Sequence, residues 1–191
     1  VQAWRACSDV IVTGSGTVSA DDCSLTLRPC DNRLDSDDWE RAMMTPTPRA
    51  VIDTNARTST SANVVAGVTP TTLFTREGAS LDLSMPGNVF QVPIASSAGG
   101  LDVRQALLKL GEQGANEILV EAGPTLVGAL EQENLIDQWL IYMAPVMLGS
   151  DARPTHHAVF NSLGQANRYL ISAHDLIGDD LRIIMRQVAE G

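Results

Sequence analysis

Apolar residues are grouped along the chain in short runs that predict buried strands. The runs at 9–14 (DVIVTG), 49–54 (RAVIDT) and 116–123 (NEILVEAG) are bounded by turn residues or loops, which is typical of strands inside a sheet. Further strands are expected at 24–28, 71–77, 88–94 and 137–148, the last interrupted at Pro145. The end of the chain predicts a β-hairpin, with arms at 168–176 and 181–188 and a turn at IGDD between them.

Helical spacing predicts two helices between these strands. Val103, Ala106, Leu107 and Leu110 recur at intervals of three to four residues within 101–114, where glycines offer a stop. A second helix is expected over residues 123–136, directly after a strand. Two segments have weaker patterns. Residues 1–9 resemble the end of a helix without a capping residue, and the polar, Pro-containing residues 31–48 predict a surface loop with one helical turn.

Strands that alternate with helices in the middle of the chain and pair at its end predict the fold class. We expect a three-layer α/β domain with a mixed, mostly parallel central sheet, helices on both faces and a C-terminal β-hairpin. The 191 residues suit one domain. A chain of this length buries roughly 70% of its unfolded surface, so it needs no disulfide or metal for stability.

Composition narrows the classes of partner. A net charge of −10 argues against a nucleic-acid surface, and no apolar run reaches the ~18 residues that span a membrane. The three cysteines, Cys7, Cys23 and Cys30, form no C-x-x-C pair and lie far from the histidines, which indicates a reduced, cytoplasmic protein without a metal site. Lys109 is the only lysine, so a basic contact to phosphate is expected from arginine.

The segment from Glu121 to Ala129 (EAGPTLVGA) contains the most chemistry. Gly123 stands at the cap position of the predicted helix and Pro124 at its first position, so the N–H groups of Thr125 and Leu126 point outwards from the positive end of the helix dipole. One interpretation is an anion site, because the absence of a side chain at Gly123 lets a phosphate approach these N–H groups closely. The other is a plain strand-to-helix turn that needs glycine for its backbone conformation.

Other charged and polar groups have two interpretations each. Glu121 ends a buried strand, where ligands of α/β sheets bind, although it could equally pair with an arginine. The GSG at 14–16 lacks the spacing of a dinucleotide fingerprint, and the Asp21–Asp22 pair after it is either a ligand contact or the acidic end of a short helix. Arg5 and Arg28 flank this stretch and could form a phosphate clamp, or be ordinary surface residues.

Several segments together resemble one family, the reductase domain of the bifunctional riboflavin-biosynthesis deaminase–reductase. They are TGSGTVSADDCSLTLR at 13–28, RAVIDT at 49–54, EILVEAGPTLVGAL at 117–130, DQWLIYMAPVMLGSDARP at 137–154 and IGDDLRI at 177–183. The resemblance extends from about residue 1 to about residue 187 in the family's order. It implies a dihydrofolate-reductase-like fold. It also implies NADPH-dependent reduction of the ribosyl group of 5-amino-6-(5-phosphoribosylamino)uracil to the ribityl product.

The resemblance also implies roles for particular residues. Contacts to the small phosphorylated pyrimidine substrate are implied for Arg5, Leu25, Arg28 and Glu121, and Glu121 is the candidate for a catalytic role through orientation and electrostatics. Contacts to the cofactor are implied for Thr17, Asp21 and Thr54, and its phosphate is expected at the helix start, Gly123, Pro124, Thr125, Leu126, Val127, Gly128 and Ala129. Arg57 or Arg76 is expected to meet the 2′-phosphate of NADPH.

The chain also departs from the family pattern. Cys23 stands where the family usually has proline, and Thr54 replaces a serine but keeps the hydroxyl. The zinc deaminase signatures, the first strand of the reductase domain and its Ser-x-Trp-Ile segment are absent, so residues 1–191 are expected to be a single, N-terminally truncated reductase domain. The family implies a homo-oligomer, a dimer or tetramer. The alternatives are a related pterin or folate reductase, and a non-catalytic fragment that binds nucleotide or dimerises.

Overall fold

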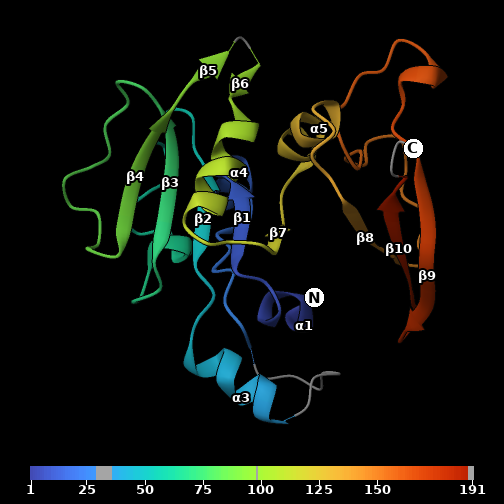
Figure 1. Cartoon of the computed structure of the whole chain (residues 1–191), viewed down its shortest axis with the longest axis horizontal. Coiled ribbons are helices and arrows are strands. Elements are labelled where there is room, and N and C mark those ends of the chain that lie inside the picture. The colour runs from blue at the N-terminus through green and yellow to red at the C-terminus, as the bar shows by residue number, and fades with distance from the viewer. Residues whose placement is uncertain (29–35, 98, 189–191) are drawn as a thin grey trace.

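The computed structural model describes residues 1–28, 36–97 and 99–188, and its centre is a parallel sheet of five strands (Figure 1). The strand order is β4-β3-β2-β1-β7, and every neighbouring pair is parallel. The strands are β1 (Val10–Gly14), β2 (Arg49–Ile52), β3 (Thr71–Arg76), β4 (Val89–Ile94) and β7 (Ile118–Val120). Because β1 is next to the sheet's edge strand β7, its carboxyl end lies beside the end of β7.

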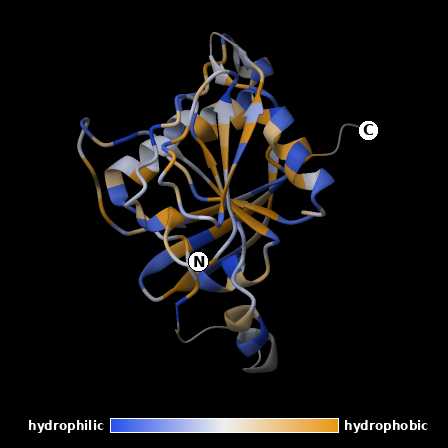
Figure 2. Ribbon diagram, turned by 90° about the vertical axis from the view of Figure 1, so that its left-hand side faces the viewer, coloured by the Kyte–Doolittle hydropathy of each residue, from blue (hydrophilic) through white to orange (hydrophobic). Residues whose placement is uncertain are grey.

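Successive residues of these strands enter two separate cores because side chains alternate across a sheet. Val10 and Val12 pack on one face with α4 (Val103–Glu112) and α5 (Pro124–Gln132). Ile11 packs on the other face with Val18 of α2 (Ser15–Asp21) and the 3₁₀ turn η1 (Asn63–Val65). Figure 2 shows the apolar strands at the centre of the molecule with helices and loops around them. The central sheet is therefore covered on both faces, as a parallel sheet requires.

A second, antiparallel sheet follows α5 and has the order β8-β10-β9. It consists of β8 (Gln138–Met143), β9 (Tyr169–Ile177) and β10 (Asp180–Gln187), and a 3₁₀ turn η2 (Leu163–Gln165) precedes β9. The C-terminal hairpin is confirmed, as is the mostly parallel central sheet. The antiparallel strands do not join that central sheet, however, because no ladder connects β7 to β8 in the described part of the chain.

A buried carboxylate fastens α5 to the second sheet. Glu131 of α5 is 5% exposed and accepts hydrogen bonds from the Tyr169 hydroxyl at 2.8 Å and from Asn167 Nδ2 at 3.1 Å. Asn167 Nδ2 also donates to the main-chain oxygen of Glu131 at 2.7 Å. Burial, together with this carboxylate, raises the pKa of Tyr169 to about 12, so the hydroxyl remains a donor at neutral pH.

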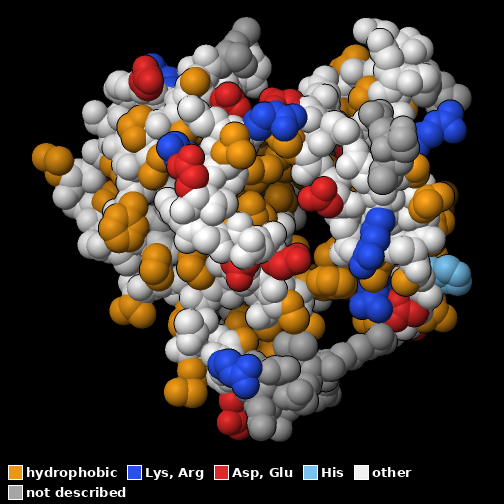
Figure 3. Space-filling view, in the orientation of Figure 1, with side chains coloured by type: hydrophobic (Ala, Val, Ile, Leu, Met, Phe, Trp, Pro, Cys, Tyr) orange, Lys and Arg blue, Asp and Glu red, His pale blue; other side chains and the backbone are white. Residues whose placement is uncertain are grey.

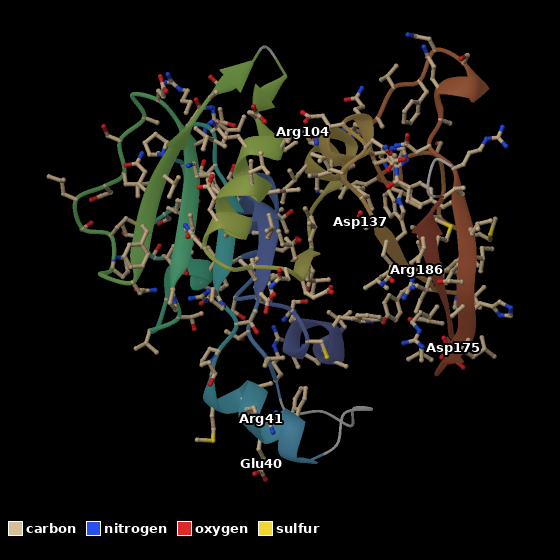
Figure 4. All side chains as sticks on the ribbon, viewed as in Figure 1. Glu40, Arg41, Arg104, Asp137, Asp175 and Arg186 are labelled. Carbon is tan, nitrogen blue, oxygen red and sulfur yellow. The ribbon has the colours of Figure 1, made fainter. Side chains whose placement is uncertain are left out.

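The remaining elements are short. They are α1 (Gln2–Ala6), α3 (Ser36–Met44) and the small antiparallel pair β5 (Ser96–Ser97) and β6 (Gly100–Leu101). Arg104 of α4 donates to the main-chain oxygen of Glu133 at 2.7 Å, and Figure 4 shows this side chain beside α5. Within the described residues, none of the helices has the length and apolar character that crossing a membrane requires.

Three local predictions differ from the structure. Residues 24–28 are not a strand, because Leu25 has a φ of 53° and the segment joins no ladder. The segment predicted as a loop contains a helix of more than two turns, α3, while residues 29–35, including Cys30, lie outside the described residues. The strand β8 ends at Met143 and does not continue beyond Pro145, which lacks the N–H that a ladder needs.

Candidate active site

The carboxyl ends of the strands border a cavity of about 880 Å³. Residues of β1, α2, the segment after β7, the start of α5 and the loop after β8 form its walls. Figure 3 shows that the surface is hollowed between the part of the molecule built on the central sheet and the part built on the second sheet. A cavity of this size suits a small-molecule or cofactor site, and its place at the strand ends is where α/β sheets bind ligands.

Glu121 and Arg5 form a two-pronged ion pair on the wall of this cavity. Arg5 Nε donates to Glu121 Oε1 and Arg5 Nη2 to Glu121 Oε2, both at 2.7 Å. The side chain of Arg5 is 11% exposed and that of Glu121 is 25% exposed, so the pair is largely shielded from water. The bond to Glu121 is the main cause that raises the pKa of the Arg5 guanidinium, which stays charged at every physiological pH.

The backbone of Glu121 is fixed as firmly as its side chain. Its N–H donates to the oxygen of Val12 at 2.9 Å, and its own carbonyl oxygen accepts from the buried Thr13 hydroxyl at 2.8 Å. Both partners belong to β1. The carboxylate therefore has a defined position at the end of the sheet, and each of its oxygens keeps lone pairs for a ligand in addition to the bond from Arg5.

Three residues further on, the start of α5 presents unpaired donors. Gly123 caps the helix without a side chain, and its N–H donates to Thr17 Oγ1 at 3.0 Å. In the described part of the chain, no acceptor meets the N–H groups of Thr125 or Leu126. A Cβ at Gly123 would have only Thr17 Oγ1 near it, at 3.5 Å, so the protein itself leaves this space open. The donors fit a phosphate group, because helix N-termini favour negative charge.

The loop after α2 brings further residues to the cavity in a strained conformation. Asp22 and Leu25 have φ angles of 42° and 53°, which cost on the order of 1–3 kcal/mol each for residues other than glycine. Three distant side chains hold this loop in place. Asn63 Nδ2 donates to Asp22 Oδ2 at 2.8 Å, Arg49 Nη1 to the oxygen of Ser24 at 3.0 Å, and Arg5 Nη1 to the oxygen of Thr26 at 2.8 Å.

Arg49 is an unusual anchor for this loop. It is 1% exposed and has no carboxylate partner in the described part of the chain. Its guanidinium donates to main-chain oxygens instead, including those of Ala66 at 3.0 Å and Thr69 at 3.2 Å. Burial lowers the pKa of Arg49, as expected for a charge removed from water.

Most of the residues predicted from the sequence line the cavity. Those that do are Arg5, Thr17, Asp21, Leu25, Thr54, Glu121, Gly123, Pro124, Thr125, Leu126 and Ala129. Val127 and Gly128 do not line it, and neither does Arg28, which is exposed. Arg57 and Arg76 are also exposed and outside the lining, and Arg76 Nε donates to Asn55 Oδ1 at 3.1 Å. The two halves of the predicted arginine clamp are thus not brought together at the cavity.

The cavity also contains residues that the sequence pattern did not single out as ligands. Arg153, Pro154 and His157 reach it from the loop after β8. Arg153 and Pro154 end the segment at 137–154 that resembles the family, but the resemblance implied no ligand role for them. Cys23 lines the cavity as well, and burial raises the pKa of its thiol, so it remains a neutral thiol at physiological pH. The described residues contain no group of three or more His, Cys, Asp or Glu side chains placed to hold a metal ion.

Comparison with protein families identifies this arrangement. The family model described as the RibD C-terminal domain matches residues 1–168. The chain belongs to the RibD C-terminal domain family. The dihydrofolate-reductase-like fold that the sequence predicted is confirmed.

Relatives of this RibD C-terminal domain are named for riboflavin biosynthesis. The protein RibD of Escherichia coli is 38% identical over 155 residues, which is 80% of this chain and 41% of that protein. The 5-amino-6-(5-phosphoribosylamino)uracil reductase of Buchnera aphidicola from Acyrthosiphon pisum is 30% identical over 189 residues, 97% of this chain and 89% of that protein. The chain spans about half the length, or less, of the RibD relatives it matches.

Solved structures of RibD proteins share the fold. One structure of Acinetobacter baumannii RibD superposes with a TM-score of 0.82 at 28% identity, and the match covers 98% of this chain and 49% of that one. The Saccharomyces riboflavin biosynthesis reductase Rib7 superposes with a TM-score of 0.68 at 16% identity, over 98% of this chain and 78% of that one. The second likeness shows the fold alone.

Proposed function

We propose that this chain catalyses the reduction of the ribosyl group of 5-amino-6-(5-phosphoribosylamino)uracil to the ribityl product in riboflavin biosynthesis, with NADPH as the reductant. One observation supports the proposal above the others. Glu121 and the free N–H groups of Thr125 and Leu126 lie four to five residues apart in the chain and border the same cavity. A carboxylate for a polar sugar and donors for a phosphate are thus fixed side by side.

The residues of the cavity fit a nicotinamide dinucleotide. The N–H groups at the start of α5 suit its diphosphate, and Thr17 keeps a hydroxyl hydrogen to donate because its oxygen already accepts from Gly123. Asp21 and Thr54 supply further polar contacts in the lining. When bound, the reduced nicotinamide supplies a hydride. The protein contributes position and electrostatics, and covalent catalysis is not needed.

Glu121 has a defined task in this proposal. The acceptor of the hydride is the ring-opened imine of the ribosylamine, in which C1′ is joined to nitrogen by a double bond. Reduction adds a hydride to C1′ and leaves the nitrogen as an amine after it has gained a proton. The carboxylate of Glu121 favours the protonated imine, because the lone pairs that its bonds to Arg5 leave free can accept a hydrogen bond from the charged nitrogen in a shielded site. Arg5 holds that carboxylate in place, with both oxygens engaged.

The test is a turnover assay that follows the loss of reduced nicotinamide absorbance. We expect oxidation of NADPH that depends on 5-amino-6-(5-phosphoribosylamino)uracil, and much less with dihydrofolate. A parallel assay uses the 2,5-diamino-6-ribosylamino-4(3H)-pyrimidinone 5′-phosphate for which an Archaeoglobus fulgidus relative, 29% identical over 157 residues, is named. Faster turnover of dihydrofolate would contradict the proposal in favour of a folate reductase, and NADPH binding without any turnover would leave a non-catalytic fragment.

We also propose that the protein acts in the cytoplasm as a homo-oligomer, a dimer or a tetramer. Support comes from the apolar residues that β9 exposes, which are Leu170, Ile171 and Leu176, at 62–69% of their full exposure. Exposed apolar groups on an edge strand are typical of surfaces that associate. Sedimentation equilibrium tests this proposal, and a monomer at micromolar concentration would contradict it.

A further inference from the structure

We propose that Arg153 and His157 complete the site for the diphosphate of the dinucleotide at the start of α5. The inference rests on the proposed function, because it takes the cavity to be the cofactor site. It adds two residues from a loop that follows β8, about 30 residues along the chain from the helix start that they serve. Neither residue was identified as a ligand from the sequence.

The balance of charge in the cavity supports a role for Arg153. Its lining has two acidic side chains, Asp21 and Glu121, and two that are permanently basic, Arg5 and Arg153. Arg5 gives its charge to Glu121 through two bonds of 2.7 Å. Arg153 makes no hydrogen bond or ion pair with any described residue, and its side chain is exposed at the cavity. A diphosphate that enters this cavity therefore has one unused guanidinium to meet.

The position of the loop supports the same assignment. The backbone N–H of His157 donates to the oxygen of Pro124 at 2.9 Å, and its Nδ1 lies 3.4 Å from Thr125 Oγ1. The loop is thus attached to the first turn of α5, beside the free N–H groups of Thr125 and Leu126. We assign it to the phosphates that those groups bind, and not to the 2′-phosphate of NADPH.

A buried glycine allows this close approach. A Cβ at Gly128 would lie 2.8 Å from the nitrogen of Ala158 and 2.9 Å from both the nitrogen and the carbonyl carbon of His157. Real Cβ atoms do not approach backbone so closely, so any larger residue at 128 would push the loop away from α5. Gly128 is therefore explained by packing: it lets the loop cross the helix, although it does not itself line the cavity.

The charge of a diphosphate explains why its binding site would need the donors of Arg153 and His157 in addition to backbone N–H groups. A diphosphate has two negatively charged phosphoryl groups, which two backbone N–H groups serve incompletely. The planar guanidinium of an arginine can make two parallel bonds to a phosphoryl group. The imidazole of His157 adds a donor on the same side, next to Thr125.

Titration calorimetry with NADPH and with NADH tests the assignment on the intact chain. Because NADH lacks the 2′-phosphate but has the diphosphate, Arg153→Ala should raise the dissociation constants of both nucleotides by the same factor, about ten-fold or more. His157→Gln should raise both by a smaller, equal factor. Arg168→Ala and His174→Gln are the matched controls, since both residues are exposed and outside the cavity, and they should leave binding unchanged.

Three results would overturn the inference, and they are distinguishable. Unchanged affinity of Arg153→Ala for both nucleotides would remove Arg153 from the site. A loss confined to NADPH would show a contact to the 2′-phosphate in place of the diphosphate. Failure of the unaltered chain to bind either nucleotide would overturn the proposed function itself, and the inference with it.

Discussion

The Arg5 guanidinium binds both carboxylate oxygens of Glu121, each at 2.7 Å, across 116 positions of sequence. The bond joins the first helix of the chain to the end of β7, the strand that leads into α5. Arg5 is the residue that the sequence predicted as one half of a phosphate clamp. In the structure the charge of Arg5 positions a carboxylate, and the free cation of the cavity is Arg153, among the residues described.

Replacement of Arg5 by lysine tests this positioning role. Lysine keeps the positive charge but replaces the planar fork by a single ammonium group, so one of the two bonds to Glu121 is lost. We expect kcat to fall by about ten-fold or more, because a charged hydrogen bond contributes about 1.5–3 kcal/mol. The dissociation constant of NADPH should stay within about two-fold. An equal loss in cofactor binding would mean that Arg5 contacts the cofactor.

Replacement of Glu121 by glutamine tests the carboxylate directly. Glutamine has nearly the same shape but no negative charge to favour a protonated imine. Turnover should fall by about a hundred-fold or more, as for other groups that stabilise charge in a transition state. NADPH binding should be almost unchanged, which separates this effect from unfolding. Turnover near that of the unaltered protein would remove the electrostatic role of Glu121.

Thr17→Val tests the link between α2 and the start of α5. The variant removes the oxygen that accepts the Gly123 N–H at 3.0 Å and also the hydroxyl hydrogen offered to the cavity. We expect the dissociation constant of NADPH to rise by about five- to ten-fold, in line with the loss of one or two hydrogen bonds of about 0.5–1.5 kcal/mol. Thr45→Val, at an exposed position outside the cavity, is the control and should bind normally.

Gly128→Ala tests whether the loop after β8 is placed by its contact with α5. A methyl group there meets the backbone at 2.8–2.9 Å, so the loop should move and NADPH affinity should fall by about the factor expected for Arg153→Ala. Gly111→Ala is the matched control, because Gly111 also lies in a helix and a Cβ there meets nothing within 4 Å. Circular dichroism of both variants should show the native helix content. Normal binding by folded Gly128→Ala would contradict this role.

The burial of Tyr169, together with its bond to Glu131, makes the stability of the protein depend on pH in the alkaline range. The pKa of Tyr169 is raised from 10 to about 12 in the folded protein, so between these values the folded state holds a proton that the unfolded state has lost. The contribution of protonated Tyr169 to the free energy of unfolding is complete below pH 10 and disappears as the pH rises through about 12. In urea unfolding, Tyr169→Phe should show a shallower loss of stability over this range than the unaltered protein. Identical slopes would contradict it.

The sequence predicted the features that depend on neighbouring residues. The strand at Val10–Gly14 follows from its apolar run, and the start of α5 follows from Gly123 and Pro124, whose backbone preferences act within one turn. The place of Glu121 follows too, because a residue that ends a buried strand must lie at the edge of the sheet. Thr17 and Asp21 of α2 were expected near the site from the family resemblance, and both line the cavity.

The features that failed prediction depend on contacts far along the chain. Leu25 belongs to a segment that alternates like a strand, but Arg49 and Asn63 hold the neighbouring residues in a strained loop. Arg153 lies at the cavity because the loop after β8 packs against Gly128. A glycine within a helix does not by itself predict that a loop packs against that helix. Neither feature has a periodicity that a single sequence could reveal, and the segment that contains Arg153 supported the family resemblance without indicating a ligand role.

The most direct measurement is a titration of the 20.4 kDa chain, labelled with ¹⁵N, with NADPH, followed through its backbone amide resonances. The account predicts that the signals of Thr125 and Leu126 shift strongly and saturate with the bound nucleotide, while amides outside the cavity, such as that of Gly111, stay in place. Saturable binding of NADPH that leaves the Thr125 and Leu126 signals unmoved would contradict it.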